Sequence, residues 1–270
     1  MRFGISTYTY TWSVGVPGSE PPDPWDEKKL VEIAAGLGVD CLQIADNLPL
    51  DSFSPQKLGE LKHLARQAGI ELEAGARGMT AERLGKYIHI ARSLDARLLR
   101  FVIDMDGFAP RVEEVVRIIR EALPLMERGN VSLAIENHDR LKASEFVEII
   151  TGVDHPLVGI CLDSVNSMGA GEGIETVTML LAPYTFNLHI KDFEIKRLPH
   201  KMGFSIEGTP AGRGQLDLDW MLAQLGEQCR SAIPELWTPP EKTLEETLKK
   251  EQQWAGESMQ YLNKGYFHHE

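Results

Sequence analysis

The sequence predicts an α/β protein, a (β/α)8 TIM barrel that occupies residues 1–270 as a single domain. Short runs of strand character alternate with amphipathic helical segments along the whole chain, and there are eight such runs. Several of these runs are almost continuously apolar, as expected for parallel strands that are covered by helices on both faces. An open doubly wound sheet is the alternative, but no G-x-G-x-x-G phosphate-binding motif follows the first run.

The eight runs are spaced so that a helix fits between neighbours. The predicted strands are 2–7, 41–45, 72–76, 98–104, 132–137, 158–163, 186–192 and 232–237. One helix is predicted to start after Asp23, with Pro24 in its first turn. Another has Ser54 as its N-cap, followed directly by proline. A third opens with Thr243 and Glu246, whose spacing is typical of a capping box.

The composition indicates a globular chain with an acidic surface. Hydrophobic residues make up 43% and charged residues 25% of the sequence, and the net charge is −12. This charge argues against a nucleic acid or an anionic membrane as partner, because both require a basic surface. The three cysteines are too few for a disulfide framework, and the N-terminus lacks the apolar run of a signal peptide. We therefore expect a cytoplasmic protein.

The longest stretch without a clear pattern is 194–215, which follows the seventh predicted strand. It contains four glycines and two prolines, so we expect an irregular loop. Its length makes it a candidate lid over the site.

Acidic residues and a histidine gather at the ends of four successive predicted strands. Active sites of such barrels lie at the carboxyl ends of the strands. Three carboxylates in one small site need either protons or a cation between them. Mixed carboxylate and imidazole ligands suit a divalent cation, so we expect one metal ion here. The predicted ligands are Glu136, Asp163, His189 and Glu235.

Other polar and aromatic residues lie close to the same strand ends. Arg100, Lys191 and Arg197 are candidates for holding a substrate carboxylate or hydroxyl groups, as is Arg213. Asp192 follows the strand of His189 and is expected either to support a ligand from behind or to shape the loop. The remaining predicted substrate-binding residues are His138, Asn166 and Trp237.

Five segments in order resemble the xylose-isomerase-like barrel superfamily of sugar phosphate isomerases and epimerases. They are LAIENH (133–138), GICLDSVNS (159–167), LHIKDF (188–193), GTPAGRGQLD (208–217) and ELW (235–237). The resemblance implies that Glu136, Asp163, His189 and Glu235 bind one divalent ion, with Mn²⁺ expected first and Co²⁺, Mg²⁺ or Zn²⁺ as alternatives. It also implies that Glu136 and Glu235 act as acid and base on opposite faces of a substrate, and that a homodimer is possible.

One position departs from the epimerase pattern of this superfamily. Those enzymes carry a substrate-binding histidine three residues after the strand-six aspartate, where this chain has Asn166. The segment 189–217 is most similar to 3-oxo-isoapionate decarboxylases within the superfamily. We therefore expect a metal-dependent isomerase or epimerase of a small keto sugar. The alternative is a lyase, either a decarboxylase of a 3-keto sugar acid or a dehydratase, and a barrel without catalysis is a further hypothesis.

Overall fold

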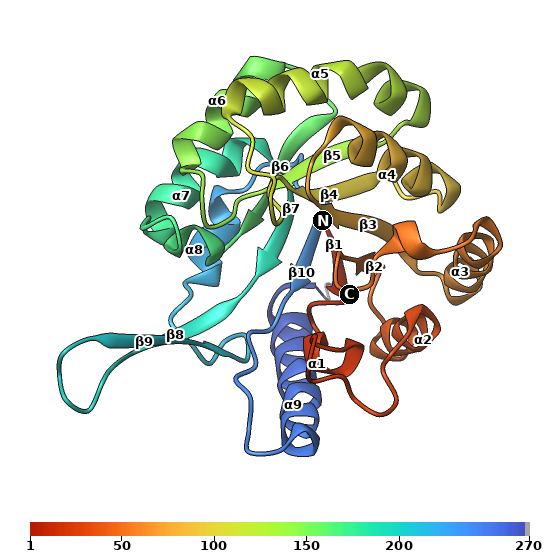
Figure 1. The fold of residues 1–270 in the computed structure, drawn as a ribbon. Coiled ribbons are helices and arrows are strands. Elements are labelled where there is room, and N and C mark those ends of the chain that lie inside the picture. Colours follow the sequence, from red (N-terminus) through yellow and green to blue (C-terminus); the bar gives the residue numbers. More distant parts are fainter. Residues whose placement is uncertain (268–270) are drawn as a thin grey trace.

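The computed structural model describes residues 1–267, in which eight parallel strands close into a barrel (Figure 1). The barrel strands are β1 (Arg2–Ser6), β2 (Cys41–Ile44), β3 (Glu71–Arg77), β4 (Leu98–Val102), β5 (Ser132–Glu136), β6 (Val158–Asp163), β7 (Thr185–Ile190) and β10 (Ser231–Pro234). The ring closes because β1 pairs in parallel with both β2 and β10. The predicted (β/α)8 TIM barrel is confirmed.

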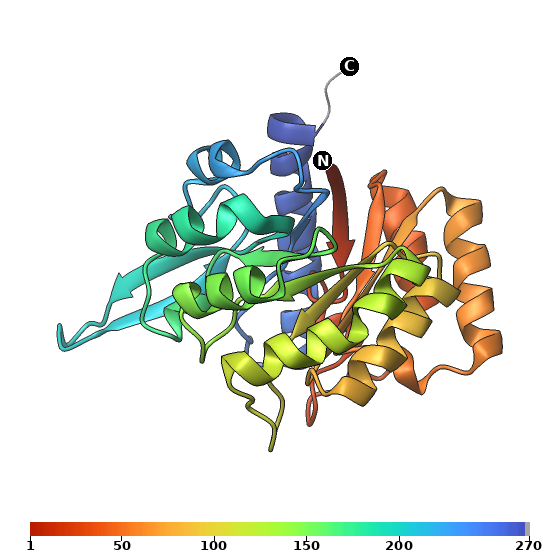
Figure 2. The same ribbon diagram turned by 90° about the horizontal axis from the view of Figure 1, so that it is seen from above.

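Helices surround the barrel and cover the outer face of its sheet (Figure 2). They are α1 (Thr11–Val14), α2 (Glu27–Leu37), α3 (Pro55–Ala68), α4 (Ala81–Ser93), α5 (Val112–Gly129), α6 (Ala143–Val153), α7 (Ile174–Leu181), α8 (Leu218–Gln224) and α9 (Leu244–Leu262). Single turns are η1 (Leu50–Ser52), η2 (Asn166–Met168), η3 (Ala182–Tyr184) and η4 (Asn263–Phe267). Among the helices of residues 1–267, none combines the length and the hydropathy needed to cross a bilayer.

Two of the three predicted helix starts agree with the structure. The Ser54 side chain caps α3, and Thr243 and Glu246 form the capping box of α9. The predicted start after Asp23 is wrong, because α2 begins only at Glu27. Asp26 is the residue that caps it, since its carboxylate accepts hydrogen bonds from two backbone N–H groups of the first turn.

The prediction of an irregular loop over 194–215 is wrong for 194–197 and 204–209, which are in strands. Strand β8 (Asp192–Arg197) pairs antiparallel with β9 (Phe204–Thr209) in a hairpin. Apolar and polar residues alternate in both strands, DFEIKR and FSIEGT, and this period of two is what defines a half-buried strand. The prolines and three of the four glycines lie outside the paired residues, and they misled the prediction.

The interior of the barrel carries polar side chains below the strand ends. Gln43 donates hydrogen bonds to Glu73 and to Asn187, and Asn187 donates to Ser231. All four residues are buried. The apolar core lies instead between the sheet and the helices, where the rings of Phe101 and Tyr87 meet edge to face, for example. The barrel therefore presents a hydrogen-bonded floor to whatever lies at its carboxyl end.

Truncating Phe101 tests this division of the core, because its ring is fully buried between β4 and α4 and lies outside the polar interior. We expect Phe101→Ala to lower the free energy of unfolding by about 3–5 kcal/mol, and Phe101→Leu to lower it by less. Urea unfolding followed by circular dichroism measures both. Met179→Ala is the control, because the Met179 side chain on α7 is exposed. An equal loss of unfolding free energy in this control would contradict the assignment of Phe101 to the apolar core.

Candidate metal centre and its cavity

Four adjacent strands bring the predicted ligands to one place at the carboxyl end of the barrel. Glu136 ends β5, Asp163 ends β6, His189 lies in β7, and Glu235 directly follows β10. These strands are consecutive neighbours in the sheet, and the register sets Asp163 beside His189. All four side chains are buried. The barrel topology alone therefore makes neighbours of residues that are up to 99 positions apart in sequence.

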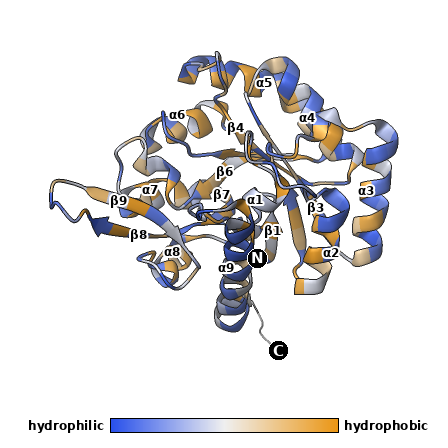
Figure 3. Cartoon of the chain, turned by 60° about the horizontal axis from the view of Figure 1, so that its bottom comes forward, coloured by the Kyte–Doolittle hydropathy of each residue, from blue (hydrophilic) through white to orange (hydrophobic). Residues whose placement is uncertain are grey.

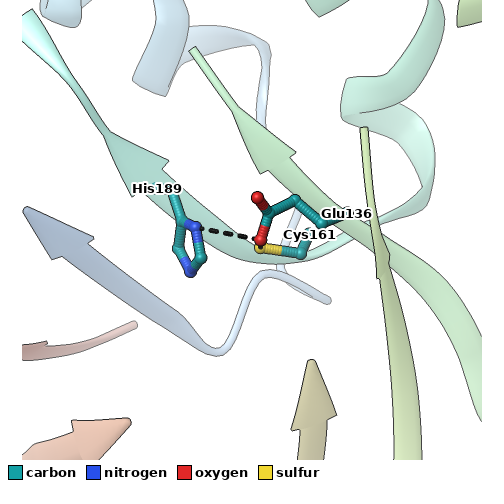
Figure 4. A group of neighbouring side chains, drawn as sticks. All are labelled: Glu136, Cys161 and His189. Atoms are coloured by element: carbon teal, nitrogen blue, oxygen red, sulfur yellow. Dashed lines mark hydrogen bonds and ion pairs between the residues drawn. The ribbon is translucent and has the colours of Figure 1, made fainter. Parts of the chain in front are cut away.

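The imidazole of His189 faces the three carboxylates. Its Nδ1 lies 3.4 Å from Glu136 Oε2, 3.5 Å from Glu235 Oε1 and 3.9 Å from Asp163 Oδ2. Figure 4 shows the ring of His189 directed at the Glu136 carboxylate, with the Cys161 thiol beside it. The ligand atoms of Asp163, His189 and Glu235 all lie within 4.8 Å of one another.

A hydrogen bond fixes which nitrogen of His189 carries the proton. Nε2 lies 2.8 Å from Gln43 Oε1, while the amide nitrogen of Gln43 already donates to Glu73 and Asn187. The amide oxygen of Gln43 must therefore accept, and Nε2 must be the donor. This leaves a lone pair on Nδ1 that points at the carboxylates.

This arrangement fits a divalent cation. Nδ1 of His189 is buried and makes no hydrogen bond within residues 1–267, and the buried Oδ2 of Asp163 is contacted by the Lys191 ammonium at 2.7 Å. A lone pair that faces three anionic groups is repelled by them unless a cation lies between. One imidazole nitrogen with three carboxylates is a donor set that divalent ions accept, so the residues present fit the predicted metal.

Hydrogen bonds from neighbouring groups fix the orientation of each carboxylate. Oδ1 of Asp163 accepts from two backbone N–H groups, those of Val165 and Asn166, at 2.9 Å each. Oε1 of Glu136 accepts from the Asn166 side chain at 2.9 Å. Ser6 Oγ donates to Glu235 Oε1 at 3.1 Å. The second oxygen of Asp163 is thereby directed at His189.

Two buried cations share these carboxylates. Lys191 Nζ lies 2.7 Å from Asp163 Oδ2 and 3.1 Å from Glu235 Oε2, and Arg100 bridges Glu136 and Asp46. The three predicted ligand carboxylates, Glu136, Asp163 and Glu235, thus face two cations, one of which is shared with Asp46, so negative charge remains that a metal cation would balance.

The same contacts shift the ionisation of the groups involved. Burial opposes the charged form of Glu235, but the positive charges of Lys191 and Arg100 lower its pKa below the usual value for glutamate. Burial also opposes the charge on Lys191, yet Asp163 and Glu235 raise its pKa above the usual value for lysine. Both groups are therefore held in their ionised forms.

A cavity of about 410 Å³ opens above the centre. Glu136, Glu235 and Lys191 reach it from the barrel. The aromatic residues Tyr8, Trp12 and Trp237 line its walls. The other lining residues are Thr11, Val16, Asp46, Arg77, Arg100, Val102, His138, Asn166, Leu236 and Thr238. Charged groups at the bottom and apolar walls above suit a small, polar, anionic molecule.

The structure brings most of the predicted substrate-binding residues to this cavity, but Arg197 and Arg213 lie elsewhere. Arg197 lies on the hairpin, where it stacks on Phe204 and donates to the backbone oxygen of Lys201. Asp192 accepts hydrogen bonds from the backbone of Gly212, Gly214 and Leu216, so it shapes the loop after β9. Arg213 lies within that loop, where its side chain is exposed and 3.6 Å from Glu257. The hydrogen bonds of Asp192 fit the second of its two expected roles, that of shaping the loop.

Sequence reasoning missed Gln43, Asp46, Arg77 and Tyr8. Asp46 follows β2 and Arg77 ends β3, so reading the ends of the second and third strands would have found both. Gln43 is a polar residue within a strand that is otherwise apolar, CLQI, and a buried amide there needs partners. Tyr8 carried no comparable signal in the sequence.

Residues 31–264 match the model of the protein family described as xylose isomerase-like TIM barrel. The chain belongs to this family. The resemblance stated from the five sequence segments is therefore confirmed.

Among the relatives of this xylose isomerase-like chain is a 3-oxo-isoapionate decarboxylase of Pectobacterium atrosepticum. It is 33% identical over 264 residues, which cover 97% of this chain and 95% of the relative. A D-psicose 3-epimerase of Clostridium cellulolyticum H10, crystallised with D-tagatose, superposes with a TM-score of 0.73 at 21% identity over 99% of both chains. A xylose isomerase-like protein of Mycobacterium smegmatis in complex with magnesium gives 0.68 at 15% identity over 97% of both. The two structural likenesses show the fold.

Metal content tests the centre directly. We expect the chain, purified without chelators and soaked with Mn²⁺, to retain about one ion. His189→Ala removes the nitrogen that faces the carboxylates and should weaken retention at least about tenfold. Elemental mass spectrometry after gel filtration measures both proteins. His155→Ala, at a surface histidine paired with Glu127, is the control and should retain the ion. Equal retention in both variants would contradict the assignment.

Gln43 provides a second, subtler test. Gln43→Leu removes the acceptor of the His189 Nε2 proton, so the tautomer with a free Nδ1 is no longer favoured. We expect metal affinity to fall about 10–100-fold while the fold persists. Gln43→Glu keeps an acceptor at the same place and should retain most of the affinity. Calorimetric titration with Mn²⁺ compares the three proteins, and unchanged affinity in the leucine variant would refute the role.

Proposed function

We propose that this chain is a divalent-metal-dependent lyase that removes the carboxylate of a small 3-keto sugar acid, with 3-oxo-isoapionate as the first candidate. The observation that carries the proposal is Lys191, whose ammonium lies within the carboxylate cluster and also lines the cavity. The decarboxylase relative, at 33% identity over nearly the whole chain, supports the same reaction class. The sequence had ranked isomerase chemistry first, and these two observations reverse the order.

Loss of a carboxylate from a 3-keto acid needs an electron sink and a proton donor. The C–C bond to the carboxylate breaks, its electron pair moves towards the ketone oxygen, carbon dioxide leaves, and the carbon then takes a proton. A divalent ion held by Glu136, Asp163, His189 and Glu235 supplies, when bound, the Lewis acid that favours charge on that oxygen. We propose Mn²⁺ as the native ion.

The residues of this chain supply the remaining parts. Lys191 Nζ carries protons at the bottom of the cavity, and Asn166 accepts from it at 3.3 Å while donating to Glu136. This chain of contacts holds the ammonium where a substrate carbon would need a proton. Arg77 lines the cavity with a weaker ion pair to Asp46, 3.7 Å long, so its guanidinium is available for a substrate carboxylate. The walls of Trp12 and Trp237 limit access of water.

Isomerase or epimerase chemistry on a keto sugar is the second candidate. It is favoured by Glu136 and Glu235, which both line the cavity and approach His189 Nδ1 from different strands. Two such carboxylates could serve as base and acid on the two faces of one carbon.

We further propose that the protein works in the cytoplasm. All three cysteines, Cys41, Cys161 and Cys229, are free and buried, which suits a reducing compartment.

A product assay separates the two reactions. The Mn²⁺-loaded protein is incubated with 3-oxo-isoapionate, and with ketoses, in deuterium oxide. We expect carbon dioxide release from the keto acid, and nuclear magnetic resonance should show one deuterium on the carbon that lost the carboxylate. Exchange of deuterium into a ketose without loss of carbon would support the isomerase instead. Absence of both reactions with every ion tested would reject the two candidates.

Lys191→Gln tests the role of the ammonium. The amide keeps hydrogen bonding but removes the charge and the acidic protons, so we expect kcat to fall about 10²–10⁴-fold. Lys249→Gln, at an exposed lysine of α9, should leave kcat unchanged. Stopped assays of carbon dioxide release compare the variants at matched metal content. A Lys191 variant that raises KM without lowering kcat would show that the ammonium only binds substrate.

A further inference from the structure

The β8–β9 hairpin projects from the barrel as an arm (Figures 1 and 2). Its register sets Ile195 beside Ile206 and Arg197 beside Phe204, so these side chains share one face. The other face carries Glu194 beside Glu207, and Lys196 beside Ser205. Hydrophobic residues colour parts of both strands in Figure 3. The arm therefore has one apolar and one charged face.

The apolar face is covered only at its base. Phe193 is 4% exposed, and Gly208 lies against Trp237 so closely that a Cβ atom there would come within 2.4 Å of the Trp237 Cβ. Further along the arm, Ile195 is 39%, Ile206 45% and Phe204 57% exposed. A two-stranded hairpin with an uncovered apolar face is marginally stable in water, so the outer half of the arm lacks a partner.

The two edges of the arm differ. Along the outer edge of β8, Ile195 donates its backbone N–H to Gln215 Oε1, and the backbone N–H of Gln215 donates to Phe193. Strand β9 has β8 as its one neighbouring strand within residues 1–267. The outer edge of β9 is therefore the one that is open for pairing with a further strand.

We infer that two copies of this chain associate through their arms, with β9 of one copy antiparallel to β9 of the other about a two-fold axis at Ile206. Such an interface is the same surface on both copies, so it must be self-complementary. In this register the row through the axis contains Ile195 and Ile206 of one copy followed by Ile206 and Ile195 of the other. Four isoleucines then form one continuous apolar row.

The charged face is self-complementary in the same register. The next row contains Glu194 and Glu207 of one copy, then Ser205 and Lys196 of the other. Within one copy the two glutamates stand opposite each other; Lys196 forms its ion pair with Glu194, at 2.7 Å, and acts on Glu207 as a more distant charge. The second copy supplies a further cation for Glu207, with the small Ser205 side chain between them.

Charge also favours a second copy at this part of the surface. The chain carries a net charge of −12, so two copies repel each other over most of their surfaces. The stretch 196–201 at the end of the arm contains two lysines, an arginine and a histidine, and no acidic residue. In the antiparallel arrangement this basic end lies beside the base and the acidic body of the other copy. In this register Phe204 of one copy lies beside Gly208 of the other, whose apolar face is directed at Trp237. The barrel of the second copy therefore covers Phe204 of the first.

Sedimentation equilibrium of the full-length chain tests the inference. We expect twice the chain mass of 30.2 kDa at micromolar concentration. Ile206→Glu places two like charges at the axis and should raise the dissociation constant of the dimer more than about tenfold. Met179→Glu, which replaces an exposed apolar residue of α7, is the matched control and should leave the dimer intact. Circular dichroism confirms that both variants are folded.

A charge exchange identifies the register. Lys196→Glu and Glu207→Lys each place like charges in the row that joins the two copies, so each variant alone should dimerise less well. A mixture of the two variants pairs each introduced charge with an opposite one, and we expect it to form a mixed dimer more tightly than either variant alone.

Three outcomes would overturn the inference. A wild-type chain that sediments as one copy would indicate that the arm closes over its own barrel or binds another protein. A dimer that Met179→Glu disrupts and Ile206→Glu does not would place the interface on the helices. A dimer indifferent to the charge exchange would reject this register.

Discussion

The hydrogen bond between His189 Nε2 and Gln43 Oε1 is the constraint on which the centre depends. It commits the proton of the imidazole to the barrel interior and leaves the Nδ1 lone pair among three carboxylates. Gln43 is itself held by Glu73 and Asn187, so the orientation of the imidazole is set by groups from three strands. A barrel interior filled with apolar side chains would bury more apolar surface, but it could not hold the imidazole of His189 in this orientation.

Closure of the barrel brings the residues that make these contacts within hydrogen-bond distance. Gln43 on β2 reaches His189 on β7 across the interior, and such a contact exists only when the sheet is a ring. Lys191 comes directly after β7, at the point where the chain leaves the barrel for the hairpin. Its ammonium is held by Asp163 on one side and Glu235 on the other, so two further strands fix its place.

The fold could be predicted from the sequence because each barrel strand is a short apolar run, and because strand-end carboxylates mark the active face. Glu136, Asp163 and His189 were found in this way without knowledge of any contact. Arg197 was not separable from the residues that line the cavity, since the same rule applies to every residue near a strand end. What decides its position is the register of the β8–β9 hairpin, and the glycines around it concealed the alternation of its strands.

Gln43 and Asp46, by contrast, are residues of the site that the sequence analysis missed. Their significance comes from partners on distant strands, and a single sequence does not record such pairings. The distribution of charge around Lys191 was equally out of reach, because it depends on which oxygen of each carboxylate points inward. Backbone hydrogen bonds to Asp163 decide that, and they follow from the turn after β6.

The contact between Gly208 and Trp237 constrains which substitutions the protein can accept in evolution. Trp237 is both a wall of the cavity and the surface on which the base of the hairpin rests. Only a residue without a side chain fits at 208, so the strand and the wall move as one piece. Substitutions that refit the cavity to another molecule would therefore also tilt the hairpin. Substrate preference and the position of the hairpin are therefore expected to change together in evolution.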